Sequence, residues 1–241
     1  MDYKRITTYF SPAKLNLKPA ISLGCVGTGL FLTMYLIKST DIPIWLYLVF
    51  PVQMLAMSFI FLVVCLMQYK SKLQRQIGDE EYDAEIGNHL GRIRNQAIRT
   101  LGIQQGNHGE MESIALGGYE FVGTTTIRRG EDSRWRSNLY HCAILFFSQS
   151  GIYWYSHQFC MTAKNTEESH EYIKYQDIMS VTTSESAVEI SGESIETYSF
   201  GILAQDGRKL TVPIQNTVRD RTAVKDIRIR ISQRQKETVQ T

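Results

Sequence analysis

The sequence predicts an α+β protein in which two apolar helices precede a β-rich domain. Two runs lack any charged side chain, Pro19 to Ile37 and Ile42 to Met67, and each is long enough to cross roughly 30 Å of hydrocarbon. From about residue 111 the apolar residues fall in short runs separated by polar turns, as in antiparallel sheets. We therefore expect a cytoplasmic N-terminal segment at 1–18, a transmembrane helical hairpin at 19–68, a linker helix at 69–103 and a folded cytoplasmic domain at 104–241.

The composition fits a folded chain with no bulk affinity for nucleic acid. Of the 241 residues 43% are hydrophobic, which is enough to bury a core. The 26 basic and 24 acidic residues nearly cancel, so the net charge of +2 gives no reason to expect nucleic acid as a partner. The four cysteines form no CxxC pair, and their spacing therefore suggests neither a disulfide framework nor a zinc site.

Charged residues around the apolar runs predict that both termini are cytoplasmic. The connection from Lys38 to Pro43 is so short that the two helices must be antiparallel neighbours. Lys38 is the only basic residue in it, whereas cytoplasmic flanks are enriched in Lys and Arg. A cleaved signal peptide is the alternative for the first run, but a second span follows at once. The basic residues on the other flanks are Lys4, Arg5, Lys14, Lys18, Lys70, Lys72 and Arg75.

Small residues line one face of the first apolar run. Ala20, Gly24 and Thr28 recur every four residues, a spacing that lets another helix backbone approach closely. This face serves either the second helix of the hairpin or a partner protein. Neither run contains an acidic or basic residue, which argues against an ion or proton relay within them.

A helix is expected between the apolar runs and the β-rich domain. Asp79, Glu80 and Glu81 suit a helix start, and Gly102 suits its end. An apolar stripe at helical spacing predicts packing on the chain's own domain, with the membrane surface or a second copy as alternatives. The stripe consists of Ile86, Leu90, Ile93, Ala97 and Leu101.

The β-rich domain is predicted to contain eight short strands and one C-terminal helix. Tight hairpins are expected between Phe147 and Ile152 and, on the stronger Asp-Gly signal, between Ala204 and Arg208. Ala223, Ile227 and Ile231 give the tail from Arg219 to about Lys236 a helical period. The expected strands are Ser113–Val122, Leu139–Phe147, Ile152–Met161, His170–Tyr175, Ile178–Thr183, Val188–Ile190, Thr197–Ala204 and Lys209–Ile214.

One stretch of this domain carries a family resemblance. Glu171-Tyr-Ile-Lys-Tyr-Gln-Asp-Ile-Met-Ser-Val181 follows the apolar runs Ile144-Leu-Phe-Phe and Gly151-Ile-Tyr-Trp-Tyr. This order resembles the "strand, then Tyr-x-Asp-Ile-x-x-Val" pattern of bacterial PH-like and GRAM-like domains over roughly residues 111–236. The resemblance implies a PH-like antiparallel β-barrel with a C-terminal helix. It also implies that Ile178 and Val181 are buried where one strand turns into the next.

The sequence offers no constellation that indicates catalysis. There is no Walker loop, nucleophile elbow or dinucleotide fingerprint. Among the five histidines only His141 and His157 are expected to meet, on adjacent strands, and a zinc site needs at least a third protein ligand. Cys142 lies in an apolar strand, where a cysteine usually belongs to the core. No catalytic, cofactor-binding or metal site is therefore expected.

A basic stretch between the first two expected strands is the best candidate for a binding site. It runs from Ile127 to Arg136 and is expected to form a loop. PH domains of eukaryotes place phosphate-binding basic residues in the corresponding loop, so the resemblance implies an anionic lipid headgroup or a phosphorylated ligand. The alternative is a loop that is exposed to solvent or contacts a partner protein and needs no ligand. The candidate residues are Arg128, Arg129, Arg134, Trp135 and Arg136.

Together these observations predict an integral membrane protein that is not an enzyme. We expect an interaction or scaffold protein that presents a PH-like domain at the cytoplasmic face, as a subunit of a larger membrane assembly. Its expected partners are the lipid bilayer and other membrane or cytoplasmic proteins, self-association included. A sensor of anionic lipid headgroups acting through the basic stretch is the alternative function.

Overall fold

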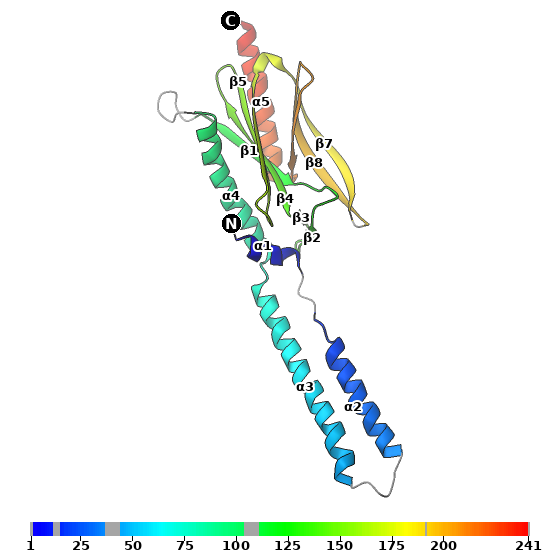
Figure 1. Cartoon of the computed structure of the whole chain (residues 1–241). Helices are drawn as coiled ribbons and strands as arrows, with labels where there is room; N and C mark the ends of the chain where they lie inside the picture. Colours follow the sequence, from blue (N-terminus) through cyan, green and yellow to red (C-terminus); the bar gives the residue numbers. More distant parts are fainter. Residues whose placement is uncertain (1, 12–14, 37–43, 104–110, 191, 241) are drawn as a thin grey trace. The chain divides into compact units, whose positions relative to one another are not determined.

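A computed structural model describes residues 2–11, 15–36, 44–103, 111–190 and 192–240 (Figure 1). The chain divides into two compact units. We call residues 11–77 the apolar unit and residues 1–10 together with 78–241 the folded unit. The expected connection between the two apolar runs, residues 38–43, lies outside the described residues.

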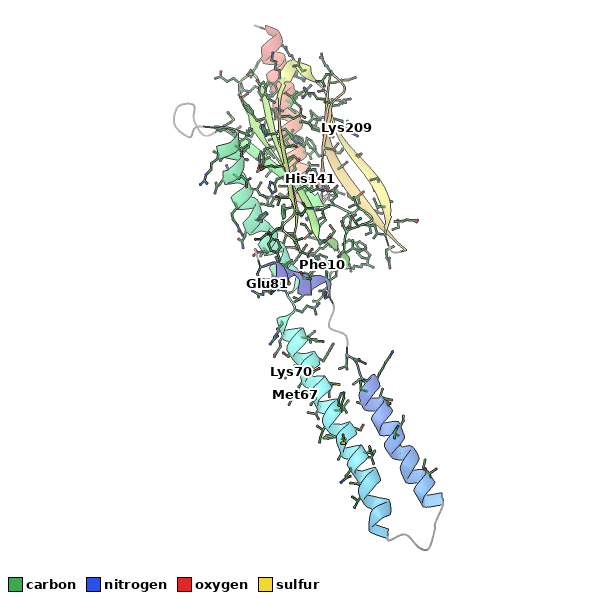
Figure 2. All side chains as sticks on the ribbon, in the orientation of Figure 1. Phe10, Met67, Lys70, Glu81, His141 and Lys209 are labelled. Atoms are coloured by element: carbon green, nitrogen blue, oxygen red, sulfur yellow. The ribbon has the colours of Figure 1, made fainter. Side chains whose placement is uncertain are left out.

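The apolar unit contains two helices that pack on each other, α2 (Lys18–Leu36) and α3 (Ile44–Arg75). Ser58 Oγ on α3 donates a hydrogen bond of 2.9 Å to the carbonyl oxygen of Ala20 on α2. Large apolar side chains remain exposed along α3; Met67, labelled in Figure 2, is 68% exposed. Of the described residues, one helical stretch, Val52–Thr100, is long and apolar enough to cross a membrane.

The folded unit begins with a helix that the sequence analysis did not predict, α1 (Tyr3–Phe10). Its side chains Ile6 and Tyr9 are buried, and the Tyr9 ring stacks on the Tyr82 ring with their centroids 4.3 Å apart. The N-terminal residues are therefore part of the folded core rather than a separate segment.

The helix expected at 69–103 starts later than its predicted bounds. α3 continues to Arg75, and α4 (Asp79–Thr100) begins after Gly78, whose backbone is extended. Gly102 follows α4 with φ +64°, a conformation that favours glycine and ends the helix. The apolar stripe faces the folded unit, in agreement with the prediction that it packs on the chain's own domain. Ile86, Ile93 and Ala97 are buried, whereas Leu90 and Leu101 are half-buried.

Two larger antiparallel sheets and one two-stranded sheet follow α4 in the folded unit (Figure 1). The first has the order β1-β4-β5-β6, with β1 (Ser113–Tyr119), β4 (Leu139–Phe147), β5 (Gly151–Cys160) and β6 (Thr166–Lys174). The second has the order β7-β8-β9, with β7 (Ile178–Ile190), β8 (Glu193–Ala204) and β9 (Lys209–Ile214). A single 3-10 turn, η1 (Tyr175–Asp177), connects them, and α5 (Val218–Gln240) ends the unit.

Most of the predicted strands are present, and two predictions are corrected. The segments predicted as Ile178–Thr183 and Val188–Ile190 form the single strand β7, because the polar residues between them continue the pairing with β8. The basic stretch predicted as a loop contains a hairpin of β2 (Ile127–Arg129) and β3 (Trp135–Ser137). The predicted Asp-Gly turn is confirmed, with Gly207 at φ +85°.

The core of the folded unit lies between the two sheets and α5. Trp154 from β5 and Phe200 from β8 stack with ring centroids 6.2 Å apart, and Val224, Ile227 and Ile231 of α5 belong to the same cluster. Burial of such large apolar side chains is the main source of stability for a domain of this size.

The two sheets approach each other closely at Gly118 of β1. A Cβ at this position would lie 3.0 Å from the backbone nitrogen of Ile214 on β9. A side chain at this position would force the backbone of β9 to shift by a few tenths of an ångström, and this close contact between β1 and β9 joins the two sheets. The folded unit is therefore α+β, with two antiparallel sheets packed around a C-terminal helix.

Candidate functional site

The β2–β3 hairpin carries all five predicted binding residues, four on its strands and Arg134 in its turn. Arg128 pairs with Arg136 and Arg129 with Trp135 in the hairpin register. The turn is closed by a hydrogen bond from the Gly130 N–H to the carbonyl oxygen of Arg134, 2.9 Å long. Because paired residues share a face, Arg128 and Arg136 lie on one side of the hairpin and Arg129 and Trp135 on the other.

Arg136 is buried and fully engaged with carboxylates. Its side chain is 3% exposed, and its guanidinium donates bidentate hydrogen bonds to Asp83 of α4, at 2.9 and 2.7 Å. A second pair of hydrogen bonds reaches Asp132 in the hairpin turn, at 2.8 and 2.9 Å. Oδ2 of Asp79 lies 3.8 Å from Nη1 of Arg136. Arg136 therefore fixes the hairpin to α4 and is not free to bind an external phosphate.

Arg128 contacts α1 on the same side of the hairpin. Its Nη1 donates to the carbonyl oxygen of Tyr9, and its guanidinium carbon lies 4.4 Å from the centroid of the Tyr9 ring. The Tyr9 hydroxyl donates a 2.7 Å hydrogen bond to Oδ1 of Asp79, whose Oδ2 accepts the N–H of Glu131. We call Tyr9, Asp79, Asp83, Asp132 and Arg136 the Arg136 cluster; it connects α1, α4 and the hairpin.

Hydrogen bonds and charge favour the ionised forms of Asp79 and Asp132. Hydrogen bonds from Arg136 lower the pKa of Asp132 to about 2, against a smaller opposing effect of burial. Burial acts to raise the pKa of Asp79, but hydrogen bonds from Tyr9 and from the Glu131 N–H, with the charge of Arg136, leave that pKa below its usual range. Burial and the hydrogen bond to Asp79 raise the pKa of the Tyr9 phenol.

Gly130 lies where the groups of the Arg136 cluster converge. A Cβ there would collide with Nη1 of Arg136, Oδ2 of Asp79 and Oδ1 of Asp132. The position therefore accepts no side chain without displacing the ion pairs. The sequence did not identify Tyr9, Asp79 and Asp83 as members of the Arg136 cluster. The two aspartates are four residues apart, which places them on one face of α4, and this spacing was the available sign that they act together.

The other side of the hairpin opens onto a cavity of about 670 Å³ within the folded unit. The start of β8 and the residues before α5 form its opposite wall. The guanidinium carbon of Arg129 lies over the Trp135 ring, 5.9 Å from its centroid. The side chain of Arg134 is 68% exposed, and its Nε lies 3.7 Å from Oδ2 of Asp132. Arg221 of α5 adds a further guanidinium to the lining. Of the predicted site, four residues line this cavity and Arg128 does not; the four are Arg129, Arg134, Trp135 and Arg136. The guanidinium of Arg136 is already hydrogen-bonded to Asp83 and Asp132.

The two histidines expected to meet lie on opposite faces of the first sheet. His157 is opposite Cys142 in the β4–β5 register, whereas His141 is opposite Gln158, one residue along the strand. His141 Nε2 is instead 2.7 Å from Ser156 Oγ. Within the described part of the chain, no group of three His, Cys, Asp or Glu side chains is arranged to hold a metal ion.

His157 lies under α4, beside a second histidine. Its ring centroid is 6.2 Å from that of His89, which in turn lies 4.4 Å from the Phe159 ring. The Nδ1 atoms of both histidines are buried and have no hydrogen-bond partner among the described residues, although His157 Nδ1 lies 3.8 Å from Glu168 Oε2. Burial lowers the pKa of His157 and brings the pKa of His89 to about 4, with Arg92 adding to the second effect. Cys142 is buried, which raises its pKa to about 12 and makes it a poor nucleophile.

The small-residue positions of the first apolar run lie within the apolar unit. Ala20 is buried and accepts the hydrogen bond from Ser58, and a Cβ on Gly24 would lie 3.2 Å from Ser58 Oγ. Thr28 Oγ1 donates to the carbonyl oxygen of Gly24 in its own helix. Ala20 and Gly24 thus mark the line along which α2 approaches α3.

Comparison of the chain with protein-family models, with curated proteins and with solved structures found no match.

Proposed function

We propose that the chain is a membrane-anchored interaction protein that presents its folded unit at the cytoplasmic face as part of a larger membrane assembly. The observation that carries this proposal is the pairing of an apolar helix whose side chains remain exposed with a well-packed folded unit. Phe59, Ile60 and Met67 of α3 are each more than 60% exposed, and such a surface requires lipid or protein around it.

The proposed anchor consists of α2 and α3 together. The second apolar run belongs to the helical stretch that is long and apolar enough to cross a membrane. The contact between Ala20 and Ser58 supports α2 as its partner in a two-helix hairpin, because a partly buried serine hydroxyl that donates to a backbone carbonyl suits a helix pair in lipid. Basic residues before α2 and at the end of α3 support the cytoplasmic placement of both termini.

We further propose that the folded unit is a PH-like barrel. The resemblance implies several antiparallel strands followed by a C-terminal helix, and the folded unit supports this with four strands, then three, then a helix that packs into the core. Ile178, which the resemblance places at the turn between strands, is buried at the start of β7. In the folded unit such a barrel would leave strand edges and the cavity beside the hairpin available to partner proteins.

Purification of the full-length chain from membranes in mild detergent tests the interaction role. We expect a partner protein to co-purify with the chain in a constant molar ratio. The control is Phe200→Asp, which places a charge in the core of the folded unit and leaves the apolar helices unchanged. Recovery of the isolated monomer from the wild type contradicts the proposal, as does a partner that is retained equally by Phe200→Asp.

Binding of anionic lipid headgroups is the second candidate function. Arg129, Arg134 and Arg221 around one cavity favour it, although Asp83 and Glu196 in the same lining reduce the positive potential. The full-length chain, reconstituted in neutral nanodiscs, should then bind fluorescent vesicles that contain anionic lipid. The variant Arg129→Ala/Arg134→Ala should lose this binding; unchanged binding would exclude the cavity as a headgroup site.

A further inference from the structure

Strand β7 forms a free edge of the folded unit. It pairs with β8 along its length, from Ile178 opposite Ala204 to Ile190 opposite Glu193. Among the described strands, none pairs with its other side, because the sheet has the order β7-β8-β9. With 13 residues it is also longer than the other described strands, so its free edge presents a long row of backbone donors and acceptors.

The side chains of β7 do not protect this edge in the usual way. Residues 182–187, the middle of the strand, are all exposed. The strand contains no Lys, Arg or Pro, which are the residues that commonly block the addition of another strand. Its irregularity in pairing is confined to the first residues, between Ile178 and Ser180, so the remainder is a regular strand. The free edge therefore has the geometry that an added strand requires.

The charge of the β7–β8 hairpin indicates the kind of strand that would bind. Between residues 178 and 204 the acidic residues are Glu185, Glu189, Glu193 and Glu196, and no basic residue occurs. Within the described part of the chain, no basic side chain forms an ion pair with any of the four. Arg228 of α5 reaches β7, but its guanidinium donates to the Thr183 hydroxyl rather than to a carboxylate.

We propose that the free edge of β7 binds an extended, basic segment of a partner protein as an additional strand. This inference rests on the proposed interaction function and names the surface and the partner chemistry. The backbone of β7 supplies the hydrogen bonds, and Glu185 and Glu189 select lysine or arginine side chains across the new strand pair. A second copy of this chain is a poorer occupant, because pairing β7 with itself would bring its own glutamates together.

Peptide binding to the full-length chain in neutral nanodiscs tests the proposal. The probe is a fluorescein-labelled ten-residue peptide of alternating lysine and threonine. The control probe alternates lysine and proline; it has the same length and charge but cannot pair with a strand edge. We expect the lysine–threonine peptide to bind at least tenfold more tightly, because charge attraction alone serves both peptides equally.

Matched protein variants distinguish peptide binding at the β7 edge from attraction of the peptide to acidic residues elsewhere in the chain. Glu185→Gln/Glu189→Gln should weaken binding of the lysine–threonine peptide by roughly fivefold, as expected for two cross-strand charge pairs. Glu80→Gln/Asp226→Asn removes the same charge from exposed positions on α4 and α5 and should leave binding unchanged. Hydrogen exchange gives a second readout, since amides of β7 should become protected only when this peptide is bound.

Three results would overturn the proposal. They are equal binding of the two peptides, equal effects of the two double variants, and peptide binding without protection of β7 amides. Each of these is independent of the purification experiment, so loss of the β7 inference is distinguishable from loss of the interaction role. A partner that co-purifies equally with wild type and with Glu185→Gln/Glu189→Gln also counts against the β7 edge alone.

Discussion

Tyr9 and Asp79 are 70 residues apart in the chain and are joined by a hydrogen bond of 2.7 Å. Tyr9 lies two residues before the apolar unit begins, and Asp79 lies two residues after it ends. This bond therefore joins the two places at which the polypeptide leaves and re-enters the folded unit. Because α1 belongs to the folded unit, a fragment that starts at residue 78 would lack part of its packing.

Replacing the Tyr9 hydroxyl tests this connection. Tyr9→Phe keeps the ring stacked on Tyr82 but removes the donor to Asp79, so the free energy of unfolding should fall by about 1 kcal/mol. Thermal unfolding of the full-length chain in detergent, followed by near-ultraviolet circular dichroism, measures the change. Tyr3→Phe on the same helix is the control. A Tyr9→Phe chain as stable as that control would show that the bond contributes nothing.

Removal of the Arg136 guanidinium should be more damaging. Arg136→Ala leaves Asp83 and Asp132 without their bidentate partner, a change that costs roughly 3–5 kcal/mol for buried pairs. We expect the lower end of this range, because both carboxylates are partly exposed. Arg134→Ala, which removes an exposed arginine from the same hairpin, should change the unfolding free energy by less than about 0.5 kcal/mol. Equal destabilisation by the two variants contradicts the assigned role of Arg136.

A side chain at Gly130 should disrupt the same ion pairs. Gly130→Ala places a methyl group against Arg136, Asp79 and Asp132, and we expect a loss of about 1–3 kcal/mol. Gly123→Ala is a matched control, because a Cβ at Gly123 meets no other atom within 4 Å. Chemical denaturation of both variants checks the difference. If Gly130→Ala lowers the free energy of unfolding no more than Gly123→Ala does, the close packing of the Arg136 cluster around Gly130 is contradicted.

The buried histidines should make the folded unit less stable in mild acid. The pKa of His89 is lowered from 6.5 to about 4 and that of His157 is also lowered, so the unfolded chain binds protons more readily than the folded chain below pH 6.5. Their contribution to stability is therefore present above pH 6.5 and is lost as the pH falls toward 4. Arg92 and His141 add to this effect, whereas Glu168 opposes it at His157.

Melting temperatures at pH 7.5 and pH 5.0 measure this dependence. His89→Phe keeps an aromatic ring against Phe159. In this variant the decrease in melting temperature between pH 7.5 and pH 5.0 should be smaller by a few degrees than in the wild type. His170→Phe, at an exposed position of β6, should leave the decrease unchanged. An identical pH dependence in wild type and His89→Phe would remove the histidine pair as its cause.

Sequence patterns predicted the regular parts of this fold well and the polar parts poorly. Strands such as Leu139–Phe147 were found because apolar runs and Gly-containing turns are local signals. β7 appeared as two fragments because its exposed polar middle, residues 182–187, gives no period-2 pattern. The helix α1 was missed because its burial depends on Tyr82 and Asp79, which are far away in the sequence.

The candidate site was located by sequence but not resolved into roles. A count of arginines identified the Ile127–Arg136 stretch, yet local sequence could not distinguish Arg136 from Arg134. Arg136 is buried because Asp83 of α4 is brought to it by the tertiary fold, whereas Arg134 remains mostly in solvent. Asp132 lies within the stretch, but the two carboxylates from α4, Asp79 and Asp83, lie more than 50 residues from Arg136 in the sequence and outside the range of any local motif.

The placement of the folded unit relative to the membrane is the central claim, and cysteine labelling of intact cells tests it most directly. In a chain whose own four cysteines are replaced by alanine, a single cysteine is introduced as Ser39→Cys, between the apolar runs, or as Ser184→Cys on β7. A membrane-impermeant maleimide should label Ser39→Cys in intact cells and Ser184→Cys only after the cells are opened. Labelling of Ser184→Cys in intact cells would contradict the account.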